Sequence, residues 1–310
     1  MNLSKSVTRL ITGVIFGFTA LFAIMAGGLY LVALVLAIVI LASKEYVKVL
    51  QHKGFRPSSR IIIASSLIFA ALAYFNRFDL VALAFSVCSI MAFMLFLLKG
   101  NQPYIANVAT TILGFVYCGW FPLHLLFLRD LGSHPVYQGF IKQNVTTEGA
   151  GYALLLFFAV ILTDSFCYYA GSKFGKHKLS KVISPNKTIE GSIGGGLICF
   201  DFFFFWGGSI GGTIMCLIFC IAFGLAIQIP WYHCIILGFL IAAFAQIGDL
   251  CESMIKRDAG VKDSSNILPG HGGFLDRTDS YILTIPVVHY YLYFFVVNNF
   301  IDLFKGIFPC

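Results

Sequence analysis

Nine apolar segments of 15 to 24 residues follow one another along the 310-residue chain, separated by short polar stretches. A helix needs about 20 apolar residues to cross a bilayer. The chain is 59% hydrophobic and only 11% charged, which excludes an ordinary soluble domain. We therefore predict an all-α polytopic integral membrane protein with about nine transmembrane helices. The predicted spans are 10–26, 28–43, 61–75, 80–98, 104–127, 151–170, 191–207, 231–249 and 281–298.

The distribution of Lys and Arg predicts which loops face the cytoplasm. Basic residues crowd the stretch 44–60, after the second span, and the stretch 171–190, after the sixth. We therefore place both stretches on the cytoplasmic side. The default location is a bacterial inner membrane, with an organelle membrane as the alternative. A further apolar segment, 209–228, could be another span, but counting it would put the polar stretches 171–190 and 250–279 on opposite faces of the membrane. These two stretches must lie on one face if both contribute to one functional site. We therefore interpret 209–228 as a kinked or re-entrant continuation.

Six of the fourteen acidic residues lie between 249 and 279. Steps of three and four residues put Asp249 and Glu252 on one helical face, and Asp276 and Asp279 face the same way if a helix begins there. Carboxylate pairs at two neighbouring helix ends predict an oxygen-ligand site for a hard divalent cation such as Mg²⁺. The alternative is a solvated interfacial loop, in which the acids cap helices and pair with Lys and Arg.

The same stretch carries side chains that suit phosphate groups. Arg and Lys donate charge-assisted hydrogen bonds to phosphate oxygens, and glycines allow the backbone to approach a ligand closely. The candidate cations are Lys256, Arg257, Lys262 and Arg277, and the glycines are Gly270, Gly272 and Gly273.

A second polar stretch runs from 163 to 191. Asp164 lies inside an apolar run, where an ionisable residue is costly and marks either a functional site or a partner for a cation on another helix. Lys187 and Thr188 open the next predicted helix, and a helix N-terminus with such donors favours phosphate. A helix cap with Glu190 as its acid is an alternative interpretation of the same residues.

The first stretch resembles the signature of the phosphatidate cytidylyltransferase family, the CDP-diacylglycerol synthases. The matching residues are Ser253, Ile255, Lys256, Arg257, Lys262, Asp263, Ser265, Leu268, Pro269, His271, Gly272, Gly273, Phe274, Asp276, Arg277 and Asp279. The second stretch is similar to the family's Asp-x-x-x-Tyr, Gly-x-x-Phe-Gly-Lys and Ser-Pro-Lys/Asn-Lys-Thr-x-Glu-Gly blocks, with Ile189 where many members have Trp. The resemblance implies a nucleotidyltransferase that converts CTP and phosphatidate to CDP-diacylglycerol and pyrophosphate.

The resemblance also implies roles for individual residues. The metal ligands would be Asp249 and Asp276, assisted by Asp279, with Mg²⁺ expected, Mn²⁺ as an alternative and a second cation such as K⁺. The catalytic group would comprise Asp249, Asp276, Asp279, Lys256, Arg257, Lys262, His271 and Arg277, with the cations contacting phosphates. The pocket would be lined by Ser253, Asp263, Gly272, Gly273, Asp164, Lys187, Thr188 and Glu190.

Two other functions fit the sequence less well. A CDP-alcohol phosphotransferase would carry Asp-x-x-Asp-Gly, whereas Ser280 follows Asp279 here. A transporter would spread its charges through the bilayer depth, and these charges crowd together. The net charge of +7 suits a surface beside anionic lipid, and no basic and aromatic interleaving indicates nucleic acid. The expected partners are phosphatidate, CTP and membrane lipid, with a homodimer left open.

The motifs also predict how the chain is divided. Residues 1–150 would form an N-terminal region of about five spans, and residues 151–310 a C-terminal catalytic region that carries both motif stretches. Because phosphatidate is a lipid and CTP is soluble, we expect the active site at the cytoplasmic boundary of the membrane.

Overall fold

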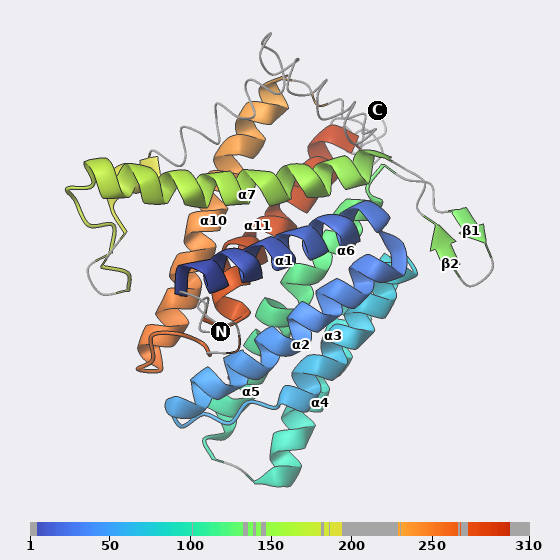
Figure 1. Ribbon diagram of the computed structural model, residues 1–310. Coiled ribbons are helices and arrows are strands. Elements are labelled where there is room, and N and C mark those ends of the chain that lie inside the picture. Colours follow the sequence, from blue (N-terminus) through green and yellow to red (C-terminus); the bar gives the residue numbers. More distant parts are fainter. Residues whose placement is uncertain are drawn as a thin grey trace, which may run out of the picture. The chain divides into compact units, whose positions relative to one another are not determined.

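The computed structural model describes residues 5–100, 102–132, 136–138, 141–143, 147–180, 183–185, 187–193, 229, 231–265, 267 and 272–297. These residues are almost entirely helical (Figure 1). The α-helices are α1 (Lys5–Ala26), α2 (Gly28–His52), α3 (Ser59–Tyr74), α4 (Val81–Lys99), α5 (Tyr104–Gly114), α6 (Phe121–Asp130), α7 (Thr147–Phe174), α10 (Trp231–Asp258) and α11 (Leu275–Tyr291). A 3₁₀ turn, η1 (Phe78–Leu80), precedes α4, and two π-helical turns, η2 (Phe115–Trp120) and η3 (Leu292–Val297), follow α5 and α11.

Six of the described helical segments are long and apolar enough to cross a membrane. They are Gly28–His52, Phe78–Lys99, Tyr104–Asp130, Glu148–Phe174, Ile236–Asp258 and Leu275–Val297. Two shorter apolar helices, Ile11–Ala26 and Ser59–Tyr74, accompany them. The chain is therefore an all-α polytopic membrane protein, as predicted. The count of nine spans stays a prediction, because residues 194–228, which include most of one predicted span and the proposed re-entrant segment, lie outside the described residues.

Two helices extend beyond the apolar segments that predicted them. α2 continues to His52, past the expected end at residue 43, because one of its faces remains buried at Tyr46, Val49 and Leu50. α10 runs on through the charged residues to Asp258, which confirms the helical continuation expected there. Both extensions carry acidic and basic side chains at the ends of helices.

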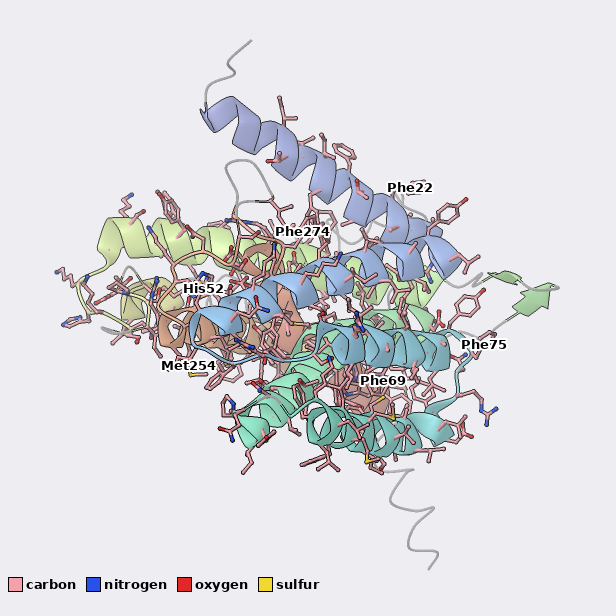
Figure 2. The ribbon with its side chains drawn as sticks, turned by 90° about the horizontal axis from the view of Figure 1, so that it is seen from below. Phe22, His52, Phe69, Phe75, Met254 and Phe274 are labelled. Carbon is pink, nitrogen blue, oxygen red and sulfur yellow. The ribbon has the colours of Figure 1, made fainter. Side chains whose placement is uncertain are left out.

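By their internal contacts the residues form two units, and the first comprises residues 1–126 with 249–282. Within it α2 packs against α1 and α3, and α4 packs against α3 and α5 (Figure 1). Phe69 is fully buried, with its ring 4.7 Å from that of Phe85 and 6.1 Å from that of Phe115. Figure 2 shows Phe69 among these helices and the exposed Phe22 and Phe75 towards the outside. Exposed apolar side chains of this kind suit a surface that faces lipid.

The second unit comprises residues 127–248 with 283–310. Its longest described helix is α7, which buries the run 152–156. Ahead of α7 lie two short antiparallel strands, β1 (Val136–Gln138) and β2 (Ile141–Gln143), with Val136 opposite Gln143. The grouping into units does not follow chain order, and the predicted division of the chain at residue 150 stays a prediction.

Candidate active site

The charged stretch that follows residue 248 folds as two helix ends within the first unit. Asp249 and Ser253 lie one turn apart on α10, and the Ser253 hydroxyl donates a long hydrogen bond of 3.4 Å to Asp249 Oδ1. Asp276 and Asp279 lie in the first turns of α11, as the spacing predicted. Asp279 Oδ1 accepts a 2.7 Å hydrogen bond from the backbone N–H of Ser280.

A buried ammonium lies at the centre of this arrangement. Lys256 on α10 is only 8% exposed, and its Nζ is 2.6 Å from Asp276 Oδ1. The same ammonium forms an ion pair with Glu252, one turn earlier on α10 and 0% exposed. Two carboxylates therefore share one cation out of water. Removing a partner from a buried ion pair leaves an uncompensated charge, so all three side chains depend on one another.

The Asp276 carboxylate ties the loop before α11 to the start of that helix. Oδ2 accepts hydrogen bonds from the backbone N–H of Gly273 at 2.8 Å and of Ser264 at 3.0 Å. The Ser264 hydroxyl lies 2.9 Å from the same oxygen. A negative charge in the first turn of a helix is also favoured by the helix dipole. Asp276 thus fixes the geometry of the loop as well as carrying charge into the site.

A second carboxylate, which the sequence did not single out, holds the same loop. Glu45 on α2 is 0% exposed and accepts four hydrogen bonds from the segments 264–265 and 274–275. Its position could have attracted notice, because it is the only Glu in the first 147 residues and stands at the charged end of an apolar run. Nothing in the sequence, however, links it to a loop 219 residues away.

Gly272 and Gly273 lie so close to Asp276 and Glu45 that a larger residue would not fit at either position. Gly272 has φ of 80°, a left-handed conformation, and a Cβ there would lie 2.9 Å from Asp276 Oδ2. A Cβ on Gly273 would collide with the Ser264 hydroxyl and with Glu45. The sequence predicted that the backbone at these glycines would approach a ligand closely. In the structure the groups that lie close to Gly272 and Gly273 are side chains of the protein itself.

The remaining predicted cations of the stretch point to water. Arg257, Lys262 and Arg277 are exposed, as is Asp263. The Arg257 guanidinium donates a 3.1 Å hydrogen bond to the carbonyl of Val261 at the end of α10. His271 lies outside the described residues. Exposed positive side chains can attract an anion from solution.

The structure does not gather the predicted metal ligands into a ready-made site. Among the described residues, no group of three or more His, Cys, Asp or Glu side chains is arranged to hold a metal ion. Both Asp276 oxygens accept hydrogen bonds from the protein, and one of them is paired with Lys256. The assignment of Asp249, Asp276 and Asp279 as metal ligands stays a prediction.

The second polar stretch belongs to the second unit. There Glu190 accepts hydrogen bonds from the backbone N–H groups of Lys176 and His177 and pairs with the His177 ring at 2.6 Å. The hydrogen bond from the His177 side chain is the largest cause that lowers the Glu190 pKa to about 2. Glu190 therefore closes the loop between α7 and the helical turn that starts at residue 189.

Other residues of this stretch also serve local structure. The Thr188 hydroxyl accepts a 3.2 Å hydrogen bond from the backbone N–H of Gly191, which caps the helical turn, as in the alternative interpretation. A Cβ on Gly175 would collide with Thr188, and a Cβ on Gly191 would collide with the Cys167 carbonyl and the Gly171 Cα. Lys187 is half-buried in this loop, and Asp164 is exposed on α7. Their predicted part in substrate binding stays a prediction.

Comparison with known proteins identifies the family. The sequence model of the cytidylyltransferase family matches residues 7–206 and 205–295, which is nearly the whole chain. The chain belongs to the cytidylyltransferase family. A phosphatidate cytidylyltransferase of Synechocystis is 32% identical, and the matched region covers 94% of this chain and 98% of the relative. One of Bacillus subtilis is 30% identical over 93% and 97%, and one of Staphylococcus aureus is 46% identical over a shorter region of 145 residues.

Membership of the cytidylyltransferase family gives the charged stretch a chemical meaning. The protein is a nucleotidyltransferase, and a cytidylyltransferase must bind the polyanionic phosphates of its nucleotide. Arg257, Lys262 and Arg277 are exposed and positively charged, and they lie in the same stretch of sequence as the buried Glu252 and Lys256.

Proposed function

We propose that the protein transfers CMP from CTP to phosphatidate, giving CDP-diacylglycerol and pyrophosphate. The observation that carries this proposal is the fold of the signature stretch. Its buried acids and buried ammonium form one hydrogen-bonded cluster, and three further cations of the stretch are exposed. The named relatives, which match over nearly the full chain, support the choice of phosphatidate as acceptor.

The main difficulty of this reaction is electrostatic. The phosphate of phosphatidate is already an anion near neutral pH, so it needs no strong general base, but it must approach a triphosphate. Catalysis then consists of neutralising charge and aligning the lipid phosphate with the α-phosphorus of CTP. We assign the neutralising role to the exposed cations Arg257, Lys262 and Arg277, because guanidinium and ammonium groups at the surface reach phosphates from solution.

Lys256 takes a different role in this proposal. Its ammonium is buried between the carboxyl groups of Glu252 and Asp276 and pairs with both. We therefore propose that Lys256 fixes the orientation of Asp276 and the net charge of the site. A direct contact between Lys256 and a phosphate, as first expected, would require this ammonium to leave at least one of its carboxylates.

A divalent cation, Mg²⁺ or Mn²⁺, fits the chemistry of this site. Mg²⁺ usually binds one or two carboxylates and completes its shell with water and substrate phosphates, so a site without three preassembled ligands is compatible with it. Asp249 and Asp276 would hold the ion with Asp279 assisting, and the ion would neutralise triphosphate oxygens and stabilise the departing pyrophosphate. At Asp276 the metal would compete with Lys256. A second cation such as K⁺ remains part of the proposal.

The lipid substrate determines where the site must lie. Phosphatidate does not readily leave the bilayer, whereas CTP is soluble, so the reaction belongs at the cytoplasmic boundary of the membrane. The crowding of Lys and Arg at 44–60 and 171–190 favours that side for the motif stretches. We propose a bacterial inner membrane as the location, and a homodimer remains an alternative to a monomer.

Pyrophosphate release by the purified protein in detergent tests the proposed reaction. We expect release that requires CTP, phosphatidate and Mg²⁺ together, and that is lost in the Asp276→Ala variant. Diacylglycerol in place of phosphatidate is the control, because it lacks the attacking phosphate. Release without phosphatidate, or none from well-dispersed phosphatidate and folded protein, would refute the proposal.

A further inference from the structure

Glu45 is an acidic residue whose carboxylate is wholly enclosed by the loop that builds the candidate site. Oε1 accepts hydrogen bonds from the Ser265 hydroxyl at 2.5 Å and from the backbone N–H of Phe274 at 3.1 Å. Oε2 accepts them from the Ser264 hydroxyl at 3.0 Å and from the backbone N–H of Leu275 at 2.8 Å. Each oxygen thus takes one hydroxyl donor and one backbone donor, which uses the full acceptor capacity of a carboxylate.

Two of these donors are backbone groups at the start of α11. The first N–H groups of a helix have no partner inside the helix, and buried ones must be satisfied from elsewhere. Here Glu45 supplies the acceptors for Phe274 and Leu275 from a different helix, and its charge is favoured by the α11 dipole. The ring of Phe274, labelled in Figure 2, also packs edge-on against Phe16 of α1, with ring centroids 6.2 Å apart.

The same contacts connect Glu45 to Asp276. Ser264 lies between the two acids, with its hydroxyl 3.0 Å from Glu45 Oε2 and 2.9 Å from Asp276 Oδ2. Gly273 donates its N–H to Asp276 and has no room for a side chain beside Glu45. Moving Glu45 would therefore displace the loop that fixes Asp276, although Glu45 is itself 0% exposed and cannot touch a substrate.

We propose that Glu45 is a positioning residue for cytidylyl transfer, which holds the 264–265 and 273–275 segments so that Asp276 and Lys256 keep their places in the site. This inference rests on the proposed function. It brings the N-terminal half of the chain into the site, through a residue that contacts only the protein.

The decisive variant is Glu45→Gln, because it preserves shape and removes one acceptor oxygen. The new NH₂ group faces one hydroxyl and one backbone N–H. The hydroxyl can rotate and accept a hydrogen bond from the NH₂ group, but the backbone N–H of Phe274 or Leu275 can only donate and is therefore left without an acceptor. The matched control is Glu148→Gln, the same change at an exposed position at the start of α7.

Two measurements read the effect. Hydrogen exchange followed by mass spectrometry, on a peptide covering residues 264–281, should be about tenfold faster in Glu45→Gln, with exchange elsewhere unchanged. The kcat per CTP-binding site, counted by the stoichiometry of CTP binding, should fall about tenfold or more, with the KM for phosphatidate within about twofold of wild type. Counting sites separates lost positioning from lost folded protein, and Glu148→Gln should leave both measurements unchanged.

The following results would overturn the inference or decide it by a second variant. Unchanged exchange and unchanged kcat in Glu45→Gln would overturn the inference, and so would faster exchange throughout the protein, which would mean that Glu45 only stabilises the fold. If Glu45→Gln does not fold, Ser265→Ala removes one of the four donors and should raise exchange in the same peptide; no rise would overturn the inference. If wild-type protein releases no pyrophosphate, the proposed function fails, and the exchange experiment still decides whether Glu45 holds the loop.

Discussion

Replacing Gly273 by Ala introduces one methyl group at the point where both acids meet the loop. The added Cβ would lie 2.8 Å from Glu45 Cδ and closer still to Glu45 Oε2 and the Ser264 hydroxyl. Contacts this short do not occur at a real Cβ, so a neighbour must move. Glu45 is held by four hydrogen bonds and Ser264 bridges two carboxylates, so neither can move without breaking a bond.

The size of the effect follows from these contacts. Adding a methyl group to a tightly packed site costs about 1–3 kcal/mol, and losing a hydrogen bond to a charged group costs about 1.5–3 kcal/mol. The Ser264 hydroxyl has one hydrogen for its two acceptors, so we count one bond and not two. Because the clash and the broken bond are partly one event, we expect a total loss of about 3 kcal/mol. A displacement of Asp276 by about 1 Å would lower turnover on the order of a hundredfold.

Thermal unfolding in detergent and pyrophosphate release measure the two effects. The control is Gly17→Ala in α1, where a Cβ would meet nothing within 4 Å and where Ala is the better helix former. We expect the control to equal or exceed wild type in melting temperature and to keep full turnover. If Gly273→Ala melts and turns over like Gly17→Ala, the loop is not clamped by Glu45 and Asp276 as described here.

Three further predictions concern other contacts. Lys256→Met leaves two buried carboxylates without their cation and should lower the free energy of unfolding by about 3–5 kcal/mol. The control, Lys53→Met, breaks the ion pair with Asp258, whose side chains are 42% and 61% exposed, and should cost under about 1 kcal/mol. Equal melting temperatures for the two variants would contradict the buried pairing. The His177–Glu190 pair is the largest cause that lowers the Glu190 pKa from 4.5 to about 2, so its stabilising effect is present above about pH 4.5 and is lost as the pH falls towards 2. The hydrogen-exchange protection of residues 175–193, measured relative to the intrinsic exchange rate at each pH, should therefore fall between pH 5 and pH 2.5 in wild type by more than in Glu190→Gln. An equal fall in both proteins would refute the pairing. Removal of divalent cations with a chelator should abolish pyrophosphate release and added Mg²⁺ restore it, and undiminished release would exclude a required divalent metal.

The helices were predictable because each has a simple local signature. An apolar run of bilayer length predicts a membrane helix from composition alone, and the described spans coincide with such runs. The helical continuation of α10 through Lys256, and the start of a helix near Asp276, followed from the spacing of charged residues. Helix ends were less predictable, since α2 runs past its apolar segment on a face that packing buries.

The contacts that build the site were beyond the reach of sequence spacing. Lys256 and Asp276 are 20 residues apart with a loop between them. The sequence suggested either phosphate partners for the cations or solvated pairs between the cations and the acids, and neither interpretation predicts a buried ion pair. Glu45 is farther still, and one acid at the end of an apolar run carries no information about which loop it meets. Tertiary packing, and the need to satisfy buried N–H groups, decided both.

The most direct test of the central claim follows the phosphorus atoms of CTP. Protein in phosphatidate-containing micelles receives CTP labelled at the α-phosphorus or, in a parallel sample, at the γ-phosphorus, and the lipid is then extracted. The proposed reaction predicts that the α label enters the lipid in equal amount to the pyrophosphate released, that the γ label never does, and that Asp276→Ala transfers neither. Transfer of the γ label to lipid, or pyrophosphate release with no label in lipid, would contradict it.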